Sequence, residues 1–326
     1  MVSNKVRKKP SVSSKGRHPA TAIDHQQPLL DVFSAAFNEV LSSATFPSLL
    51  RDIKRALFDR EFAAAFSDER RLEAYAARWS PTRALCYASV LLELVPHLEA
   101  LLGSDAADTL HLLCVGGCAA ELAAAAAYAR VTPSYVGVTL VDAAPWSHVI
   151  DILRHRLCVA PELSKYASPA AVAANAPFVD GSRLSVNFCR HDVLDLSRES
   201  LTELAGPHPL LVTLLFTLNE MYADGGLTKT TAFLRNLGEA LPSTSLLLVM
   251  DSPGSYSEAA VGKDKRRYPM QWLLNHTLLD TEARGCRWEK LESNDSLWFR
   301  LPEALSYPIQ LEDMRYQMHL YRILKP

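Results

Sequence analysis

The spacing of hydrophobic side chains changes twice along the chain. Residues 1–25 hold almost none of the large ones, residues 26–102 repeat them every three or four positions, and residues 103–326 collect them in short continuous runs. A three-to-four-residue repeat is typical of amphipathic helices, and short apolar runs are typical of strands covered on both faces. The pattern predicts a disordered tail, an N-terminal helical extension and an α/β domain, in that order.

The helical extension is predicted from hydrophobic positions such as Leu30, Phe33 and Phe37, which share one face of a helix. A later helix is expected to begin at Ser80, because serine is a preferred N-cap and the following Pro81 is tolerated in the first helical turn. The hydrophobic face of this helix continues through Leu85.

Seven hydrophobic runs follow, at residues 109–115, 135–141, 184–189, 210–216, 245–250, 297–301 and 318–324. The first five alternate with helical or loop stretches, which predicts βαβ units. The fold class expected for residues 103–326 is therefore α/β and Rossmann-like, with a mostly parallel seven-stranded sheet flanked by helices.

Composition narrows the classes of protein. The net charge of −2 does not predict a surface that is basic overall. The first 23 residues nevertheless carry six cations and no acid, which fits a nuclear address, an RNA-binding tail or a solubilising tail. No run of about 20 apolar residues is present, so no membrane span is expected. Six cysteines without a CxxC pair favour buried free thiols, and no metal site is expected.

A glycine turn follows the first predicted strand. The segment Val-Gly-Gly-Cys-Ala-Ala-Glu at 115–121 leads into an alanine-rich stretch, and a strand, a turn and a helix in this order are typical of nucleotide-binding sites. Gly116 and Gly117 would let the backbone approach a cofactor, with Cys118 and Glu121 beside it. A full GxGxxG is missing because Cys118 stands where a further glycine is common, and a tight turn without a ligand explains the residues equally well.

Acidic residues end the next two strands. Asp142 is placed to accept both hydroxyl hydrogens of a ribose, and Asp192 to accept from an adenine amino group while Val193 packs on the ring. Asp142 could instead cap the following segment, and Asp192 could belong to a turn. Together with the glycine turn, these strand ends predict one adenosine-binding crevice at the carboxyl edge of the sheet.

Polar residues also follow the fourth and fifth strands. Phe216 ends the fourth strand on the cofactor side, and Asn219 and Glu220 come directly after it. Asp251 and Tyr256 belong to a loop rich in Ser, Pro and Gly at the same edge. Loops at this edge usually carry the site, so the four polar residues are candidates for catalysis, although they could simply end their strands.

Two basic clusters could contact RNA. Arg78 and Arg83 flank Trp79, which could equally anchor the core. The second cluster lies in the predicted loop beyond the fifth strand and consists of Lys263, Lys265, Arg266 and Arg267. Such cations next to an aromatic residue can bind phosphate and stack a base, but an ordinary solvated loop explains this cluster better when it is taken alone.

Four of these segments together resemble one family. They are Arg-Trp-Ser-Pro-Thr-Arg-Ala-Leu at 78–85, the Gly116-Gly117 turn, Phe-Thr-Leu-Asn-Glu at 216–220 and Asp-Ser-Pro-Gly-Ser-Tyr at 251–256. Over roughly residues 28–326 the chain is similar to the fungal 25S ribosomal RNA uracil-N3 methyltransferases. The resemblance implies a class I methyltransferase fold, S-adenosylmethionine as cofactor, and a uridine of large-subunit rRNA, free or in a pre-ribosome, as acceptor.

The resemblance also implies roles for single residues. Gly116, Gly117 and Asp142 would hold the cofactor, and Asp192 would lie near its base, whereas Cys118 departs from the usual glycine and bears on how closely the cofactor approaches. A nuclear or nucleolar location follows from the implied substrate, with the cytoplasm as the alternative.

Methylation at N3 of uracil requires removal of the proton on that nitrogen. Glu220, Asp251 or Tyr256 is expected to assist, with Asn219 positioning the base. Other classes stay open: a non-catalytic ribosome-assembly factor with the same fold, or a methyltransferase acting on protein or a small molecule. An NAD-dependent oxidoreductase would need a fuller glycine fingerprint and a Tyr-Lys or His constellation, which the sequence does not show.

Overall fold

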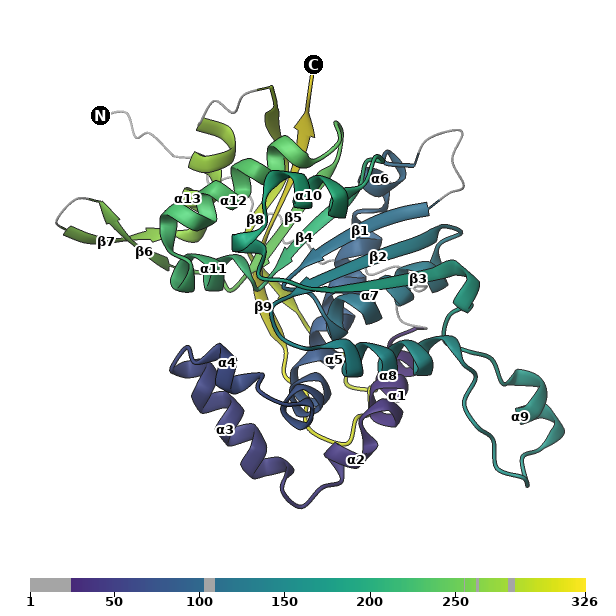
Figure 1. The fold of residues 1–326 in the computed structure, drawn as a ribbon. Coiled ribbons are helices and arrows are strands. Elements are labelled where there is room, and N and C mark those ends of the chain that lie inside the picture. Colours follow the sequence, from purple (N-terminus) through teal and green to yellow (C-terminus); the bar gives the residue numbers. More distant parts are fainter. Residues whose placement is uncertain (1–24, 103–108, 255, 262–263, 281–284) are drawn as a thin grey trace, which may run out of the picture.

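A seven-stranded sheet forms the centre of the molecule (Figure 1). The structure is a computed structural model that describes residues 25–102, 109–254, 256–261, 264–280 and 285–326. The strand order is β3-β2-β1-β4-β5-β9-β8. The strands from β3 to β5 in this order pair parallel, whereas β9 runs antiparallel to both β5 and β8. The strands are β1 (Thr109–Val115), β2 (Tyr135–Asp142), β3 (Leu184–Arg190), β4 (Leu211–Leu215), β5 (Leu246–Asp251), β8 (Arg287–Phe299) and β9 (Met314–Leu324).

Alternate strand residues enter two separate hydrophobic cores, one on each face of the sheet. In β1, Leu112 and Cys114 belong to the first core, whereas Leu113 and Val115 belong to the second. Successive side chains of a strand point to opposite faces, so a strand covered on both faces needs a continuous hydrophobic run. This is why the central strands could be predicted from the sequence.

Helices cover both faces (Figure 1). α5, α7 and α8 contribute side chains to the first core, and α10, α12 and α13 contribute to the second. The bounds are α7 (Ala119–Val131), α8 (Ser147–Cys158), α9 (Pro169–Ala174), α10 (Arg198–Ala205), α11 (Leu218–Asp224), α12 (Gly226–Ala240) and α13 (Met270–Asn275). Short turns of other helix types are η2 (Gly181–Arg183), η3 (Val193–Asp195) and η4 (His276–Asp280).

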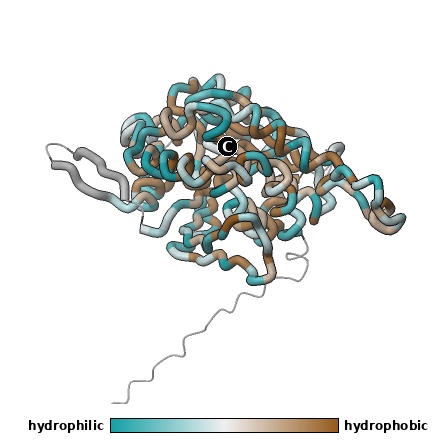
Figure 2. Tube along the Cα trace, turned by 90° about the horizontal axis from the view of Figure 1, so that it is seen from below, coloured by the Kyte–Doolittle hydropathy of each residue, from teal (hydrophilic) through white to brown (hydrophobic). Residues whose placement is uncertain are grey.

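The first helices of the N-terminal extension lie at the end of the sheet where the parallel strands finish, while α5 packs on one face of the sheet (Figure 1). It comprises α1 (Gln26–Ala36), α2 (Asn38–Leu41), α3 (Phe46–Phe58), α4 (Phe62–Ala65), α5 (Glu69–Glu93) and α6 (Val95–Glu99). In Figure 1, α1 to α4 form a layer below the sheet. Seen from below in Figure 2, hydrophobic and hydrophilic residues alternate over short stretches of the trace, as amphipathic helices require. Leu30 and Phe33 of α1 join the first core, so the extension and the sheet share it.

The prediction that a helix begins at Ser80 is wrong. α5 begins at Glu69, where the Asp68 side chain accepts from the Arg71 amide at 3.0 Å, and Pro81 lies inside the helix. Proline has no N–H to donate to the carbonyl four residues earlier, which here is that of Ala77. The Tyr307 hydroxyl, from the connection between β8 and β9, donates to the Ala77 carbonyl at 2.8 Å instead. A tertiary contact thus supplies the hydrogen bond that proline removes.

The strand predictions were confirmed for the main sheet, with one large boundary error. The run at 297–301 covers only the last residues of β8, which begins at Arg287. A second sheet was missed: β6 (Tyr256–Val261) pairs antiparallel with β7 (Asp264–Pro269), where a loop was expected. The predicted disordered tail lies outside the described residues except for His25.

Among the described helices, none is both long and apolar enough to cross a membrane. All six cysteines are free thiols. Within the same described part of the chain, no group of three or more His, Cys, Asp or Glu is arranged to hold a metal ion.

Candidate active site

A cavity of about 610 Å³ opens at the carboxyl ends of β1 to β4, between the sheet and the N-terminal helices. This volume lies within the range typical of small-molecule sites. Strand ends supply Gly116, Cys118, Glu121, Asp142, Asp192, Val193 and Phe216 to its wall. We call it the first cavity. It brings together seven of the eight residues predicted to bind the cofactor.

The eighth, Gly117, lies in the turn but does not line the cavity. A side chain at Gly117 would meet the Cys114 Cβ at 2.6 Å, and one at Gly116 would meet the Thr217 side chain at 2.5 Å. Gly116 also has a φ of +65° and donates its amide to the Val141 carbonyl at 2.8 Å. Both glycines are therefore required by close packing, and Gly116 in addition by its backbone conformation.

Cys118 and Glu121 cap the helix that follows the turn. The Cys118 side chain accepts from the Glu121 amide, and the Glu121 carboxylate accepts from the Cys118 amide at 2.9 Å. In this reciprocal capping box, Cys118 is the N-cap residue of α7. Glu121 is buried, and burial raises its pKa to about 7 against the opposing effect of its backbone hydrogen bonds.

Asp142 and Asp192 both line the first cavity and both bind backbone. Asp142 accepts from the Ala144 amide at 2.7 Å, and Asp192 accepts from the Leu194 amide at 3.0 Å. These bonds fit the alternatives that the sequence left open, a cap for Asp142 and a turn residue for Asp192, yet each carboxylate also borders the cavity. Burial raises the pKa of Asp142 to about 6.

Phe216 adopts a strained backbone at the end of β4. Its φ is +61°, a left-handed conformation that is rare for a bulky residue, and its amide donates to the Met250 carbonyl at 2.7 Å. Strained residues persist where their surroundings fix them, and they concentrate at functional sites. The Arg83 guanidinium lies 5.2 Å from the centre of the Phe216 ring.

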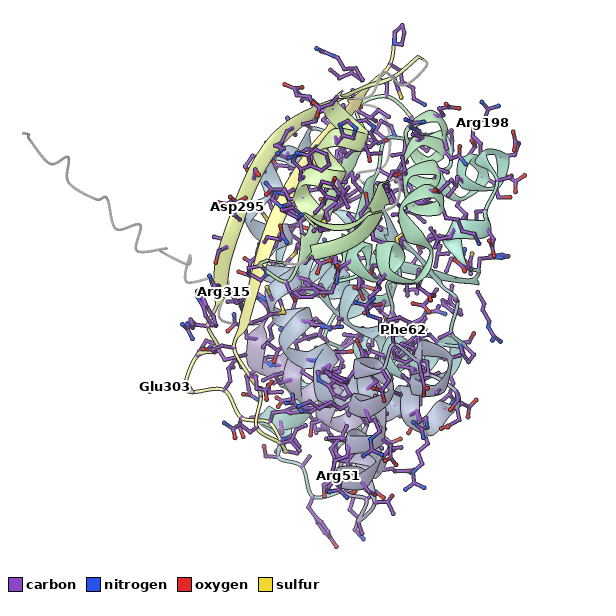
Figure 3. All side chains as sticks on the ribbon, turned by 90° about the vertical axis from the view of Figure 1, so that its left-hand side faces the viewer. Arg51, Phe62, Arg198, Asp295, Glu303 and Arg315 are labelled. Atoms are coloured by element: carbon purple, nitrogen blue, oxygen red, sulfur yellow. The ribbon has the colours of Figure 1, made fainter. Side chains whose placement is uncertain are left out.

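A second cavity, of about 230 Å³, adjoins the first. Its wall consists of Leu57, Arg60, Phe62, Tyr75, Trp79, Arg83, Asn219, Glu220 and Ala223. Four of these residues also line the first cavity, namely Phe62, Tyr75, Arg83 and Glu220. In Figure 3, Phe62 lies at the level where the N-terminal helices meet the rest of the molecule. The two cavities thus share one wall, built by α4, α5 and α11.

Arg83 is held in this shared wall. Its Nη1 donates to the Tyr75 hydroxyl at 2.6 Å, and its guanidinium lies over the rings of Tyr75 and Phe216. Tyr75 in turn packs on Trp79 and Trp146, with ring centres 5.0 and 5.8 Å away. Nearby carboxylates and phenols raise the pKa of Arg83 against the effect of burial, so it stays a cation. Arg83 can therefore contact RNA only through a group that enters one of these two cavities.

Glu220 lies on α11 at the boundary between the cavities. The largest effect on its carboxyl is desolvation by the surrounding protein, which raises the pKa to about 7. Solvent in the cavities still reaches the side chain. The positive charge of Arg83 opposes the rise, and the carboxylates of Asp251, Asp142 and Asp224 add to it. A carboxyl with a pKa near neutrality is suited to accept a proton at physiological pH.

The other catalytic candidates are placed less directly. Asn219 lines the second cavity, but Asp251 is buried outside both cavities and accepts from the amides of Asn219 and Ser252. Asp251 therefore fixes the start of α11. Tyr256 begins β6, and its side chain lies outside what the structure describes.

The remaining basic candidates lie away from the cavities or outside the described side chains. Arg78 forms an ion pair with Glu312 at 2.9 Å and covers the Trp79 ring. Residues 265–267 lie on β7, where only the backbone is described, and Lys263 is outside the described residues. Arg78, the one of these five cations whose side chain the structure describes, is not among the residues that line the two cavities.

Sequence reasoning missed most of the wall contributed by the N-terminal helices. Phe62, Phe66 and Tyr75 form its aromatic part, with Phe66 packed edge-on against Tyr75 at 5.1 Å, and Trp146, which precedes α8, adds a further ring to the cavity wall. The Phe62–Phe66 spacing gave only a helical period, which does not distinguish core residues from cavity residues. The Arg83-Tyr75 hydrogen bond joins positions two helical turns apart on α5. This spacing was the one feature of the sequence that could have indicated that the two side chains lie on the same helix face.

Fold and site together define a class I, Rossmann-like methyltransferase, with the predicted seven-stranded sheet and its reversed strand near the C-terminus. The profile of the family described as "Putative SAM-dependent methyltransferase" matches residues 33–322. The chain belongs to this family, and its cofactor is S-adenosylmethionine.

Individual relatives were also found. The chain is 28% identical over 327 residues to the 25S rRNA (uridine(2843)-N(3))-methyltransferase of Saccharomyces cerevisiae, which covers 90% of this chain and 85% of the yeast protein. Solved structures with weaker likeness include the 16S rRNA (adenine(1408)-N(1))-methyltransferase from Catenulisporales acidiphilia, at 14% identity and a TM-score of 0.38 over 71% of this chain and 94% of that one. The N-methyltransferase NodS from Bradyrhizobium japonicum in complex with S-adenosyl-L-homocysteine has 14% identity and a TM-score of 0.35 over 78% and 96%.

The residues of the first cavity fit this cofactor. S-Adenosylmethionine carries a sulfonium and an ammonium cation, and the cavity wall holds the carboxyls of Glu121, Asp142, Asp192, Glu220 and Asp224. Burial raises the pKa of Glu121 and of Asp142, with a smaller contribution from a neighbouring carboxylate in each case, and a bound cation would offset both effects. Cys118 does not obstruct the cavity through a free side chain, because its thiol caps α7.

Proposed function

We propose that this protein transfers a methyl group from S-adenosylmethionine to N3 of a uridine in large-subunit ribosomal RNA, free or within a pre-ribosome. The observation that carries the proposal is the pair of cavities with one shared wall, because methyl transfer needs donor and acceptor on opposite sides of the reacting methyl carbon. The choice of uridine N3 as acceptor is inferred from the activity in the name of the yeast relative. A nuclear or nucleolar location follows from such a substrate.

The first cavity would hold the donor. We assign Asp142 to the ribose hydroxyls and Asp192 with Val193 to the adenine, as their places at the ends of β2 and β3 favour. Gly116 would allow close approach, and Glu121 would lie near the cationic part. When bound, the donor supplies an electrophilic methyl group on a positively charged sulfur.

Glu220 would act as the proton acceptor. It takes the proton from N3, the N3 electron pair forms the new bond to the methyl carbon, and the carbon–sulfur bond breaks to leave S-adenosylhomocysteine. Glu220 is the candidate of choice over Asp251, since Asp251 binds two backbone amides outside the cavities. Asp251 would instead position Asn219, and a role for Tyr256 stays a prediction.

Two measurements test the proposal. Purified protein should bind S-adenosylmethionine in a calorimeter, and it should convert one uridine of unmodified large-subunit rRNA to 3-methyluridine, detected by mass spectrometry of nucleosides. rRNA from cells that lack the gene should have lost the same nucleoside. Cofactor binding with methylation of another acceptor would overturn the rRNA assignment, and absence of cofactor binding would favour a non-catalytic assembly factor.

A further inference from the structure

We propose that the second cavity is the acceptor-base pocket and that it selects a uracil-type ring, in which an N–H lies between two carbonyl oxygens. This inference rests on the proposed function and adds the site and the chemical basis of its selectivity. The side chains that carry it are those of Arg60, Arg83, Asn219 and Glu220, with aromatic walls from Phe62 and Trp79.

Size and shape suit a single base. A volume of about 230 Å³ is small for a cofactor but sufficient for one pyrimidine ring with part of its sugar. Phe62, Tyr75 and Trp79 supply aromatic surfaces, and a base taken out of its strand is commonly held by stacking on such rings. The base would have to leave its stack to enter.

The polar groups match one kind of heterocycle. Arg60, Arg83 and the amide of Asn219 can donate hydrogen bonds, whereas Glu220 is the carboxylate among the residues of this wall. A uracil ring offers two carbonyl acceptors flanking one N–H, so donors on either side of a carboxylate complement it. Cytosine has an amino group in place of one carbonyl and no proton on N3, and it would leave a donor facing a donor.

Arg83 is pre-organised for this role. Its hydrogen bond to Tyr75 and its stacking on Phe216 fix the guanidinium before any ligand arrives. As N3 loses its proton, negative charge spreads to the flanking oxygens, and a fixed cation stabilises that charge more than it stabilises the neutral base. We therefore assign Arg83 to recognition and to stabilisation of the developing anion.

The test measures equilibrium binding of uridine 5′-monophosphate to protein loaded with S-adenosylhomocysteine. Arg60→Asn and Asn219→Ala change residues of the second cavity that do not line the first, and asparagine tolerates the φ of +60° at position 60. Each should weaken nucleotide binding at least about fivefold and leave cofactor affinity within twofold, which also shows that the variant has folded. Cytidine 5′-monophosphate should bind more weakly than the uridine nucleotide to the unchanged protein.

The reciprocal variant and a surface control complete the design. Asp142→Asn, in the first cavity alone, should weaken cofactor binding, and Arg235→Gln, an exposed cation on α12, should change neither affinity. If rRNA is methylated with unchanged KM by Arg60→Asn and Asn219→Ala, the base pocket is refuted while the proposed function stands. If the nucleotide binds as predicted but uridine in rRNA is never methylated, the pocket stands and the proposed function is wrong.

A separate observation concerns the exposed face of α3. Arg51, Lys54, Arg55 and Phe58 form one stripe along this helix, and Phe58 is 87% exposed. Among the described residues these three cations have no ion-pair partner. Leu57, in the last turn of this helix, and Arg60, two residues beyond its end, border the second cavity. In Figure 3, Arg51 lies at the bottom of the molecule, well below Phe62.

We infer that this stripe binds the RNA strand next to the acceptor base, with cations on phosphates and Phe58 stacked on a neighbouring base. This inference also rests on the proposed function. The double variant Arg51→Gln/Arg55→Gln should weaken binding of an rRNA fragment severalfold at low salt and reduce the salt dependence of that binding, and Phe58→Ala should weaken it further. Uridine 5′-monophosphate should bind all of these normally. RNA affinity and salt dependence equal to those of the Arg235→Gln control would refute the stripe.

Discussion

Glu220 shows how one side chain can gain a chemical role from its surroundings. As an isolated glutamate it would be ionised well below neutrality, but crowding in the cavity wall raises its pKa to about 7. Arg83 opposes this shift, and Asp224 is one of three carboxylates that strengthen it. The balance leaves a carboxyl that titrates near physiological pH, as the proposed proton acceptor requires.

The pH dependence of methyl transfer should report this balance. The base must be ionised to accept a proton, so the rate should rise with pH up to about 7 and then level off. Asp224→Asn removes a neighbouring negative charge, so the pKa of Glu220 falls and the profile shifts to lower pH. Glu220→Gln should reduce kcat by roughly 10²- to 10⁴-fold and abolish the rise. A Glu220→Gln enzyme that keeps the wild-type profile would show that another group takes the proton.

Single residues also explain what sequence reasoning could find at the site. Glycines and acids at strand ends lie where the chain leaves a hydrophobic run, so Gly116, Asp142 and Asp192 could be predicted. Tyr75 and Phe62 could not, because their position in the wall depends on how α4 and α5 fold back over the sheet. The place of Asp251 along the chain does not reveal that two amides bind its carboxylate, and its catalytic role stays a prediction.

At the level of elements, α5 depends on a residue far away in the sequence. The helix continues through Pro81 because the Tyr307 hydroxyl donates to the carbonyl of Ala77. The same helix carries Tyr75, Trp79 and Arg83 in the wall shared by the cavities or beside it. Continuity of α5 is therefore a condition for the geometry of the site.

A double-mutant cycle should reveal this dependence. Tyr307→Phe leaves the carbonyl without its donor and should lower the free energy of unfolding by about 1–2 kcal/mol. In a Pro81→Ala background the new amide can donate to Ala77, so Tyr307→Phe should cost clearly less there. Urea unfolding of all four proteins measures the coupling. Equal losses in both backgrounds would contradict the proposed replacement of the missing bond.

The strands also differ in how well they can be predicted from the sequence. The five parallel strands are buried on both faces and read as continuous hydrophobic runs, so their ends were predicted to within one residue or so. β8 pairs only with β9 and carries many polar residues, so most of it had no such signal. β6 and β7 were missed for the same reason, since charged residues dominate β7.

At the level of the whole molecule, the acidic residues of the first cavity lie between the sheet and the N-terminal helices, which share one hydrophobic core. Glu121 takes part through a raised pKa of about 7, compared with an ordinary value of 4.5. Between these values the folded protein holds a proton that the unfolded chain has released. The contribution of Glu121 to stability is thus present at low pH and is lost as pH rises through about 7. His319 has the opposite effect, since burial lowers its pKa to about 4.

The variant Glu121→Gln isolates the contribution of Glu121 titration to the pH dependence of stability. Glutamine can keep the hydrogen bond from the Cys118 amide but does not titrate. The variant should therefore gain stability relative to the wild type as pH rises from 5 to 8, by an amount on the order of 3 kcal/mol. Denaturant unfolding at several pH values gives the difference between the two proteins, in which His319 cancels. A difference that does not change with pH would show that Glu121 is ionised throughout.

The wall common to the two cavities links their occupants thermodynamically. A positive ligand in the first cavity lowers the pKa of Glu220, and by reciprocity an ionised Glu220 tightens the hold on that ligand. After transfer the leaving sulfur is neutral and only the ammonium charge of the product remains, so this mutual support weakens with the reaction. Glu220 would then be ionised chiefly while a transferable methyl group is present, which makes the spent cofactor the weaker competitor and directs the cycle forward.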